Sequence, residues 1–205
     1  MPADSALVRV SGIHKFFTRG SERVDVLQNL SLEVPAAEFL GLMGPSGSGK
    51  TTLLNLIGGL DRPTSGRIWV GDQEITSLGR KALAEVRLRH IGFVFQEYNL
   101  VPVLSALENV EYVLLLQGVD EQRRRAEALR LLHALGLEGM EHRRPNELSG
   151  GQQQRVAVAR AVVGSPSILL ADEPTGNLDS TNSEAVMDLL KELHRGGATI
   201  CMVTH

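Results

Sequence analysis

Cysteine is almost absent from this sequence: Cys201 is the only one among 205 residues. A single thiol excludes an internal disulfide, and its place in the apolar run 199–203 favours a buried strand residue over a reactive group. A strong charge of either sign is also lacking, because the formal net charge is −3. No broad basic field is present to attract nucleic acid. We therefore predict that nucleic acid is not a partner.

Long hydrophobic runs are missing too. None approaches the roughly 20 apolar residues that a helix needs to cross a bilayer. Nothing near Met1 resembles a signal peptide, because Asp4 and Arg9 interrupt the stretch early. We expect a cytoplasmic chain that reaches a membrane, if at all, through a partner. With 42% hydrophobic and 22% charged residues, its composition is that of a folded domain, and its length suits one domain or a core with an inserted lobe.

Short apolar segments bounded by turn residues alternate with helical patterns along the chain. They predict strands at residues 7–10, 30–34, 39–43, 67–70, 91–95, 167–171 and 198–203. Helices are predicted at residues 50–60 and 183–195. Between residues 104 and 137, leucine, valine and alanine recur with a period near 3.6 and no strand alternation appears. This stretch is interpreted as a helical lobe inserted into an α/β core.

A glycine-rich loop follows the strand predicted at residues 39–43. It fits the pattern G-x-x-x-x-G-K-[ST] without a mismatch, and a predicted helix follows it. Glycines let the backbone turn so that N–H groups face a phosphate chain, and the helix start adds its positive end. The predicted nucleotide-binding residues here are Gly44, Pro45, Ser46, Gly47, Ser48, Gly49, Lys50, Thr51 and Thr52. Lys50 would neutralise the β and γ phosphates, and the Thr51 hydroxyl would hold Mg²⁺.

Two carboxylates close the apolar run 168–171. Open α/β sheets bind ligands at the carboxyl ends of their strands, so Asp172 is predicted to support Mg²⁺ and Glu173 to act as general base toward water. Two solvated acids at a strand end are the alternative, and the phosphate-binding loop upstream favours the catalytic interpretation.

A second candidate anion site lies at residues 148–152, read Leu-Ser-Gly-Gly-Gln. A serine and two glycines at a helix start leave N–H donors free for an anion. Ser149 and Gln152 also stand three apart, as a capping box requires, so a capped helix start is the alternative interpretation.

Together these motifs resemble the nucleotide-binding subunit of an ABC transporter over nearly the whole length. The resemblance adds Gln96, which senses Mg²⁺ and water in that family and hinges the helical lobe. It adds Asp179, in the loop 176–179 that crosses a dimer, and His205, the histidine that contacts the γ-phosphate. The predicted catalytic residues are therefore Glu173, Gln96 and His205, and the predicted Mg²⁺ residues are Thr51, Gln96 and Asp172.

The resemblance also implies a fold and a way of working. The fold is α/β, a P-loop NTPase (RecA-like) core with an antiparallel β subdomain and an inserted α-helical subdomain. Residues 1–96 and 156–205 would form the core and residues 97–155 the lobe. ATP, with Mg²⁺, would join two copies head to tail. Each ATP site would be completed by residues of the opposite copy: Ser149, Gly150, Gly151, Gln152 and Asp179. Residues 97–104 would receive an integral membrane subunit on the inner face of the membrane. Their packing on their own lobe is the alternative.

Two departures from the family pattern are visible. The family usually stacks adenine on a tyrosine, whereas this chain has Phe16 and Phe17 in that region; Phe17 is predicted, with Phe16 as the alternative. The sequence also ends at His205, directly after a predicted core strand, where the family normally continues. We therefore expect a truncated form, whose competence in hydrolysis is open.

Residues 95–102, 106–110 and 172–179 are most similar to the lipoprotein-release and macrolide-efflux group of ABC ATPases. The alternative within the family is a cell-division ATPase that signals through a membrane partner without transport. A soluble ABC ATPase acting on ribosomes or DNA would usually have two cassettes or a long coiled-coil insertion, and this chain has neither. A regulator without turnover is disfavoured because Glu173, the predicted base, is present.

Overall fold

The centre of the molecule is a parallel sheet. In a computed structural model, which describes residues 6–20 and 22–204, its strands follow the order β3-β8-β7-β6. They are β3 (Phe39–Leu42), β8 (Thr199–Val203), β7 (Ile168–Asp172) and β6 (Ile91–Val94). β7 and β8 lie in the middle and are almost entirely buried. Central strands of a parallel sheet are covered on both faces, which explains their unbroken apolar runs.

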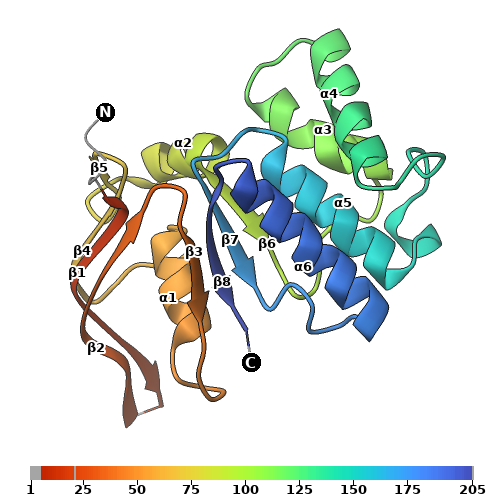
Figure 1. The fold of residues 1–205 in the computed structure, drawn as a ribbon. Coiled ribbons are helices and arrows are strands. Elements are labelled where there is room, and N and C mark those ends of the chain that lie inside the picture. The colour runs from red at the N-terminus through yellow and green to blue at the C-terminus, as the bar shows by residue number, and fades with distance from the viewer. Residues whose placement is uncertain (1–5, 21, 205) are drawn as a thin grey trace.

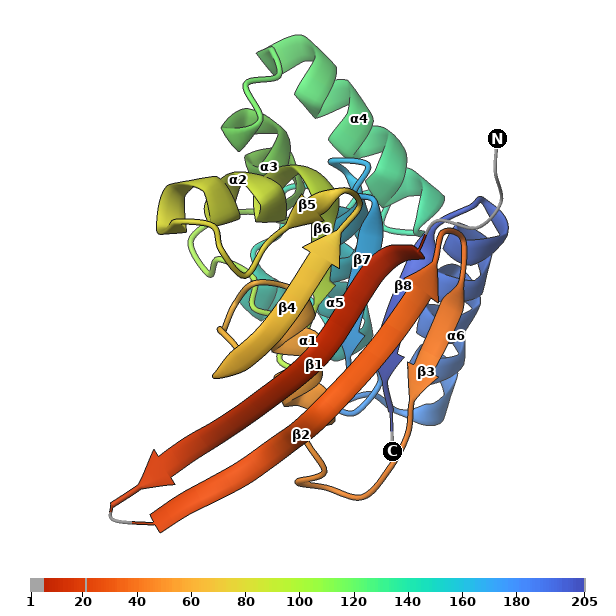
Figure 2. The same ribbon diagram turned by 90° about the vertical axis from the view of Figure 1, so that its left-hand side faces the viewer.

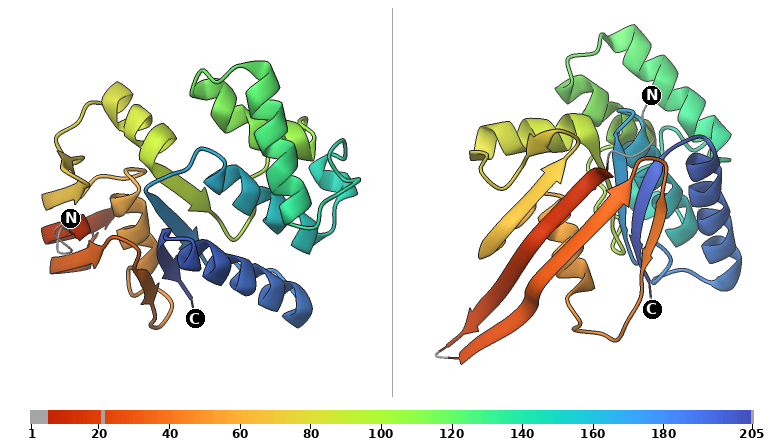
Figure 3. Two further views of the ribbon diagram at one scale, coloured as in Figure 1. Left: turned by 45° about the horizontal axis from the view of Figure 1, so that its top comes forward. Right: turned by 60° about the vertical axis from the view of Figure 1, so that its left-hand side comes forward.

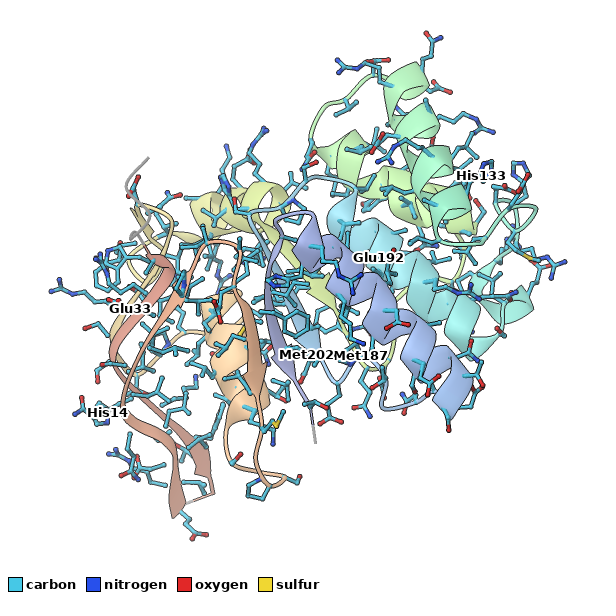
Figure 4. The ribbon with its side chains drawn as sticks, in the orientation of Figure 1. His14, Glu33, His133, Met187, Glu192 and Met202 are labelled. Carbon is cyan, nitrogen blue, oxygen red and sulfur yellow. The ribbon has the colours of Figure 1, made fainter. Side chains whose placement is uncertain are left out.

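Helices cover both faces of this sheet (Figure 1). α1 (Lys50–Ile57) lies on one face, and α5 (Gly150–Val162) and α6 (Ser180–Arg195) lie on the other. Alternate residues of β7 serve the two sides: Leu170 packs in the cluster with α1, and Leu169 packs with α5 and α6. Met187 of α6 and Met202 of β8 belong to the second cluster (Figure 4).

An antiparallel sheet stands beside the parallel one. It has the order β2-β1-β4-β5 and is made by β1 (Ala6–Arg19), β2 (Glu22–Pro35), β4 (Ser65–Val70) and β5 (Gln73–Glu74). β1 and β2 are 14 residues each and form a long hairpin that extends beyond the rest of the fold (Figure 2). α1 therefore lies between the two sheets (Figure 1).

The length of this hairpin corrects the sequence interpretation. Strands were expected only at residues 7–10 and 30–34, yet pairing continues from Ala6 opposite Pro35 to Arg19 opposite Glu22. Register shifts interrupt the alternation along β1, and the outer part is mostly exposed. Bulges and exposed polar positions remove the period-two apolar pattern, so the sequence does not show where the strands end.

The helical lobe contains α3 (Ala106–Leu116), α4 (Glu121–Ala134) and a short 3-10 turn (Pro145–Glu147), confirming the helical pattern expected there (Figure 3). Its core includes Leu107, Val110 and Leu132. α5 serves both parts, because Val156 packs in the lobe and Val158 in the sheet core. The predicted boundary between residues 155 and 156 falls inside α5, and the division into core and lobe stays a prediction.

One helix lacks any sequence prediction: α2 (Arg80–His90). It is rich in charged residues, and Leu83 and Val86 are the residues that it buries. Two buried positions give too weak an apolar stripe for the period of 3.6 to stand out. Among residues 6–20 and 22–204, no helix combines the length and apolar character needed to cross a membrane.

Candidate functional site

The glycine-rich loop joins the end of β3 to the start of α1. Gly44, Gly47 and Gly49 have φ angles of 151°, 79° and 90°, a region that glycine adopts without the cost a side chain would impose. Gly49 is the residue before α1, and a Cβ there would lie 3.1 Å from the Val26 carbonyl oxygen and 2.9 Å from Leu27 Cδ2. The glycine spacing that the sequence motif demands is therefore explained by this backbone path.

A cavity of about 270 Å³ opens beside the loop. Its walls are Val26, Ser46, Gly47, Ser48, Gly49, Lys50, Thr51, Thr52 and Glu173. The Lys50 ammonium lies across the loop and donates to the carbonyl oxygens of Gly44 at 2.7 Å and Pro45 at 2.9 Å. The cavity thus brings together a cation, a helix N-terminus and the hydroxyls of the loop, an arrangement suited to phosphate groups.

Of the two predicted carboxylates, Glu173 forms part of the cavity wall, and Asp172 contacts the wall residue Thr51. The Thr51 hydroxyl donates to Asp172 Oδ1 at 3.0 Å, so the loop and the end of β7 are in direct contact. Glu173 follows with a φ of 46°, and its N–H donates to the Val203 carbonyl oxygen at 3.1 Å. A left-handed glutamate costs roughly 1–2 kcal/mol of backbone strain. This turn takes Glu173 out of the strand line and places it on the cavity wall.

The oxygen donors fit Mg²⁺. The Thr51 hydroxyl and the Asp172 carboxylate are adjacent, and no group of three His, Cys, Asp or Glu residues suited to a metal occurs among residues 6–20 and 22–204. Mg²⁺ at phosphate sites usually takes one or two protein oxygens and completes its shell with phosphate and water. A protein cage is therefore not required here.

Gln96 lies beside the loop 176–179 and is not one of the cavity wall residues. The Asn177 side-chain amide donates to the Gln96 carbonyl oxygen at 3.1 Å. A Cβ on Gly176 would lie 2.7 Å from Gln96 Nε2, so a larger residue there would displace the Gln96 amide. Two predicted motifs that are far apart in the sequence are thus held against each other.

Ser149 is the N-cap of α5. Its hydroxyl accepts from the Gln152 N–H at 3.3 Å, and the Gln152 side chain accepts from the Ser149 N–H at 2.8 Å, which confirms the predicted capping box. Gly151 lies against α6, where a Cβ would come 2.1 Å from Asn182 Oδ1. Asn182 also donates to Asp179, the N-cap of α6.

These hydrogen bonds lower the pKa of the Asp179 carboxyl, chiefly through the Asn182 backbone N–H. A stable carboxylate at a helix N-terminus stabilises that helix. The residues Ser149, Gly150, Gly151, Gln152 and Asp179 are absent from the walls of the phosphate-loop cavity. They form a second group at the start of α5 and α6.

Sequence reasoning missed two residues near the predicted site. Val26 forms part of the cavity wall because a bulge between the pairs Lys15–Leu27 and Phe16–Asp25 leaves it without a partner on β1. Arg160 of α5 donates to the carbonyl oxygens of Tyr98 at 2.9 Å and Asn99 at 2.6 Å. No local pattern marks either one, because both depend on contacts across the fold.

Arg160 stabilises an unusual backbone after Gln96. Tyr98 and Asn99 have φ angles of 53° and 49°, and burial lowers the pKa of Arg160. Replacing Arg160 with methionine is expected to leave two carbonyl groups short of donors and to lower the free energy of unfolding by about 2 kcal/mol. Denaturant unfolding measures this, with Arg123→Met on the exposed face of α4 as the unaffected control. Equal stability of both variants would contradict it.

Phe17, another predicted residue, is not part of the cavity wall. It lies on β1, is 46% exposed, and has the Lys15 ammonium 4.7 Å from its ring centre. His205 lies outside the described residues. Thr204, which precedes it, donates its N–H to the Leu42 carbonyl oxygen at 3.2 Å, at the end of the strand that leads into the phosphate-binding loop. The roles assigned to these site residues stay predictions.

Comparison with known proteins agrees with this geometry. The protein-family model described as ABC transporter matches residues 27–176 of this chain. The chain is 49% identical over 193 residues to an uncharacterized ABC transporter ATP-binding protein of Thermotoga maritima, covering 94% of this chain and 82% of that protein. It is 47% identical to the macrolide export ATP-binding/permease protein MacB of Escherichia coli, covering 97% of this chain but 31% of that protein.

A solved structure shows the same architecture. The ATP-binding cassette MJ0796, in a dimeric post-hydrolysis state with ADP and phosphate, superposes with a TM-score of 0.90 at 44% identity, covering 97% of this chain and 88% of that one. This likeness confirms the predicted ABC-type P-loop fold. The chain belongs to the ABC transporter family, as an ATP-binding subunit with ATPase activity.

Proposed function

We propose that ATP is held and hydrolysed at the cavity beside the glycine-rich loop. The main support for this proposal is that Lys50 and Glu173 both form part of the wall of that cavity. Glu173 accepts a proton from water, whose oxygen attacks the γ-phosphorus. The bond to the bridging oxygen then breaks, releasing ADP and phosphate. Thr51, Asp172 and Gln96 would hold Mg²⁺, which supplies charge neutralisation to the phosphates.

Two copies complete each site in this proposal. The group formed by Ser149, Gly150, Gly151 and Asp179 lies away from the cavity of its own chain, and the similar cassette MJ0796 is dimeric. A head-to-tail pair related by a two-fold axis places each ATP between the loop of one copy and Ser149 of the other. ATP binding then closes the pair, and hydrolysis weakens it.

The closing motion is proposed to drive an integral membrane subunit on the inner face of the membrane. Residues 97–104 offer the contact surface. The Asn109 amide, buried on α3, accepts from the Val101 N–H at 2.8 Å and fixes the shape of this segment. Val103 is left 72% exposed. Leu100 of the same segment packs against the lobe core, whereas Val101 and Val103 stay exposed. The segment is therefore partly packed on its own lobe, and its exposed apolar side chains support docking of the membrane subunit there.

The physiological role that we propose is export, lipoprotein release or macrolide-type efflux. Support comes from MacB, a macrolide export ATP-binding/permease protein whose ATP-binding part is similar to this chain. The test is coexpression with the membrane protein encoded beside this chain, followed by copurification and transport assays in vesicles. MgATP-dependent transport supports the proposal. A stable complex that regulates cell-wall hydrolysis without transport would support the division-type alternative.

Changing Val103 to aspartate is expected to reduce copurification with this membrane subunit at least about tenfold, because a carboxylate in an apolar contact loses its hydration. ATPase activity of the isolated chain is expected to stay unchanged. Leu116→Asp is the matched control, since Leu116 is also exposed, at 54%, and lies at the end of α3. Equal retention by both variants would remove residues 97–104 from the interface.

A further inference from the structure

Lys15 is a buried cation that the proposed reaction does not use. Its residue is 9% exposed, which is rare for lysine unless it is paired. The ammonium lies 2.7 Å from Asp61 Oδ2, donates to the Arg62 carbonyl oxygen at 2.8 Å, and sits 4.7 Å from the centre of the Phe17 ring. One side chain therefore contacts both β1 and the segment that follows α1.

We propose that Lys15 is a positioning residue that holds the Phe17 ring as a platform for the adenine base. This inference rests on the proposed binding of ATP with Phe17 as the stacking residue. The ammonium covers one face of the ring, and the exposed part of Phe17 is offered to the base. Phenylalanine has no hydroxyl to fix its orientation, so a contact with the ring itself is needed to select one rotamer.

The same ammonium also links the Phe17 ring to the segment after α1, the helix that follows the phosphate-binding loop. Asp61 lies just after α1, and its N–H donates to the Asn55 carbonyl oxygen at 3.3 Å. α1 begins at Lys50, which contacts the glycine-rich loop. Lys15 thus connects the strand that carries the ring to the helix that carries the phosphate contacts. A ligand that spans both parts gains affinity when they are preorganised.

The same contacts separate Phe17 from Phe16. The Lys15 ammonium lies over the Phe17 ring. Phe16 instead has the Arg23 guanidinium 4.1 Å from its ring centre, on the exposed part of the hairpin. Backbone bonds also join this region, since Thr64 donates its N–H to the His14 carbonyl oxygen at 2.8 Å. These bonds fix the strand but do not reach the Phe17 ring.

The test compares two ligands that differ in the base. Dissociation constants for ATP and for tripolyphosphate, both with Mg²⁺, are measured by calorimetry on the full chain. Lys15→Met is expected to weaken ATP binding about fivefold and to leave tripolyphosphate binding unchanged. Lys15→Arg keeps a cation beside Asp61 and is expected to recover most of the loss. The double variant with Phe17→Ala is expected to bind ATP no more weakly than Phe17→Ala alone.

Each outcome decides between the claims. Equal weakening of both ligands by Lys15→Met assigns Lys15 a purely structural role and overturns the inference, as does unchanged ATP binding. Unchanged ATP binding in Phe17→Ala removes the stacking role itself, which is a separate failure. If Lys15→Met does not fold, Asp61→Asn keeps the lysine while weakening its anchor, and the same loss selective for ATP is expected. Absence of that selectivity would then overturn the inference.

Discussion

Changing Glu173 to glutamine is expected to lower the ATPase rate by about a thousandfold, because an amide cannot accept the proton of the attacking water. Binding of MgATP is expected to persist, since the change leaves the loop and Lys50 intact. The left-handed backbone at Glu173 strains glutamine no more than glutamate. Phosphate release under saturating MgATP measures the rate.

The same variant is expected to accumulate as a dimer. If ATP joins two copies and hydrolysis separates them, blocked hydrolysis leaves the closed pair, which size exclusion detects in MgATP. Glu192→Gln is the matched control: the same change on the exposed face of α6 (Figure 4), with unchanged turnover expected. A Glu173→Gln chain that stays monomeric would contradict the head-to-tail arrangement. A chain that keeps its rate would remove Glu173 as the base.

Local chemistry made the central part of the site predictable. The positions of Gly44, Gly47 and Gly49 follow from a backbone path that needs positive φ angles, so the residue type and its spacing carry the geometry directly. The capping box of Ser149 and Gln152 spans three residues and is equally local. The strands β7 and β8 were predictable from their unbroken apolar runs, which arise because both faces of the sheet are covered.

Contacts made across the fold were not predictable. Val26 reaches the cavity through a strand bulge, and Arg160 contacts residues that lie about 60 positions earlier in the chain. Lys15 is separated by more than 40 positions from Asp61. In each case the residue type is ordinary for its element, and only the packing of that element gives it a partner. Helix α2 was not predicted for a related reason: it buries too few residues to show an apolar stripe in the sequence.

Replacing Lys50 with alanine is expected to weaken MgATP binding by about a hundredfold or more. Contacts between an ammonium and a phosphate oxygen are charge-assisted and contribute about 1.5–3 kcal/mol each. The Lys50 ammonium donates to the Gly44 and Pro45 carbonyl oxygens, so it lies over the loop. Fluorescent ATP titration with saturating Mg²⁺ measures the affinity.

Two comparisons separate loss of the cation from loss of the loop. Lys191→Ala removes an exposed lysine that pairs with Asp188 on α6, and surface pairs of this kind contribute little, so its ATP affinity is expected to match the parent chain. In Lys50→Ala, tripolyphosphate should weaken as strongly as ATP, because the lost contact involves phosphate alone. A Lys50→Ala chain with unchanged affinity would remove the phosphate role of the glycine-rich loop. If ATP weakened while tripolyphosphate did not, Lys50 would act on the base or ribose, which its position over Gly44 argues against.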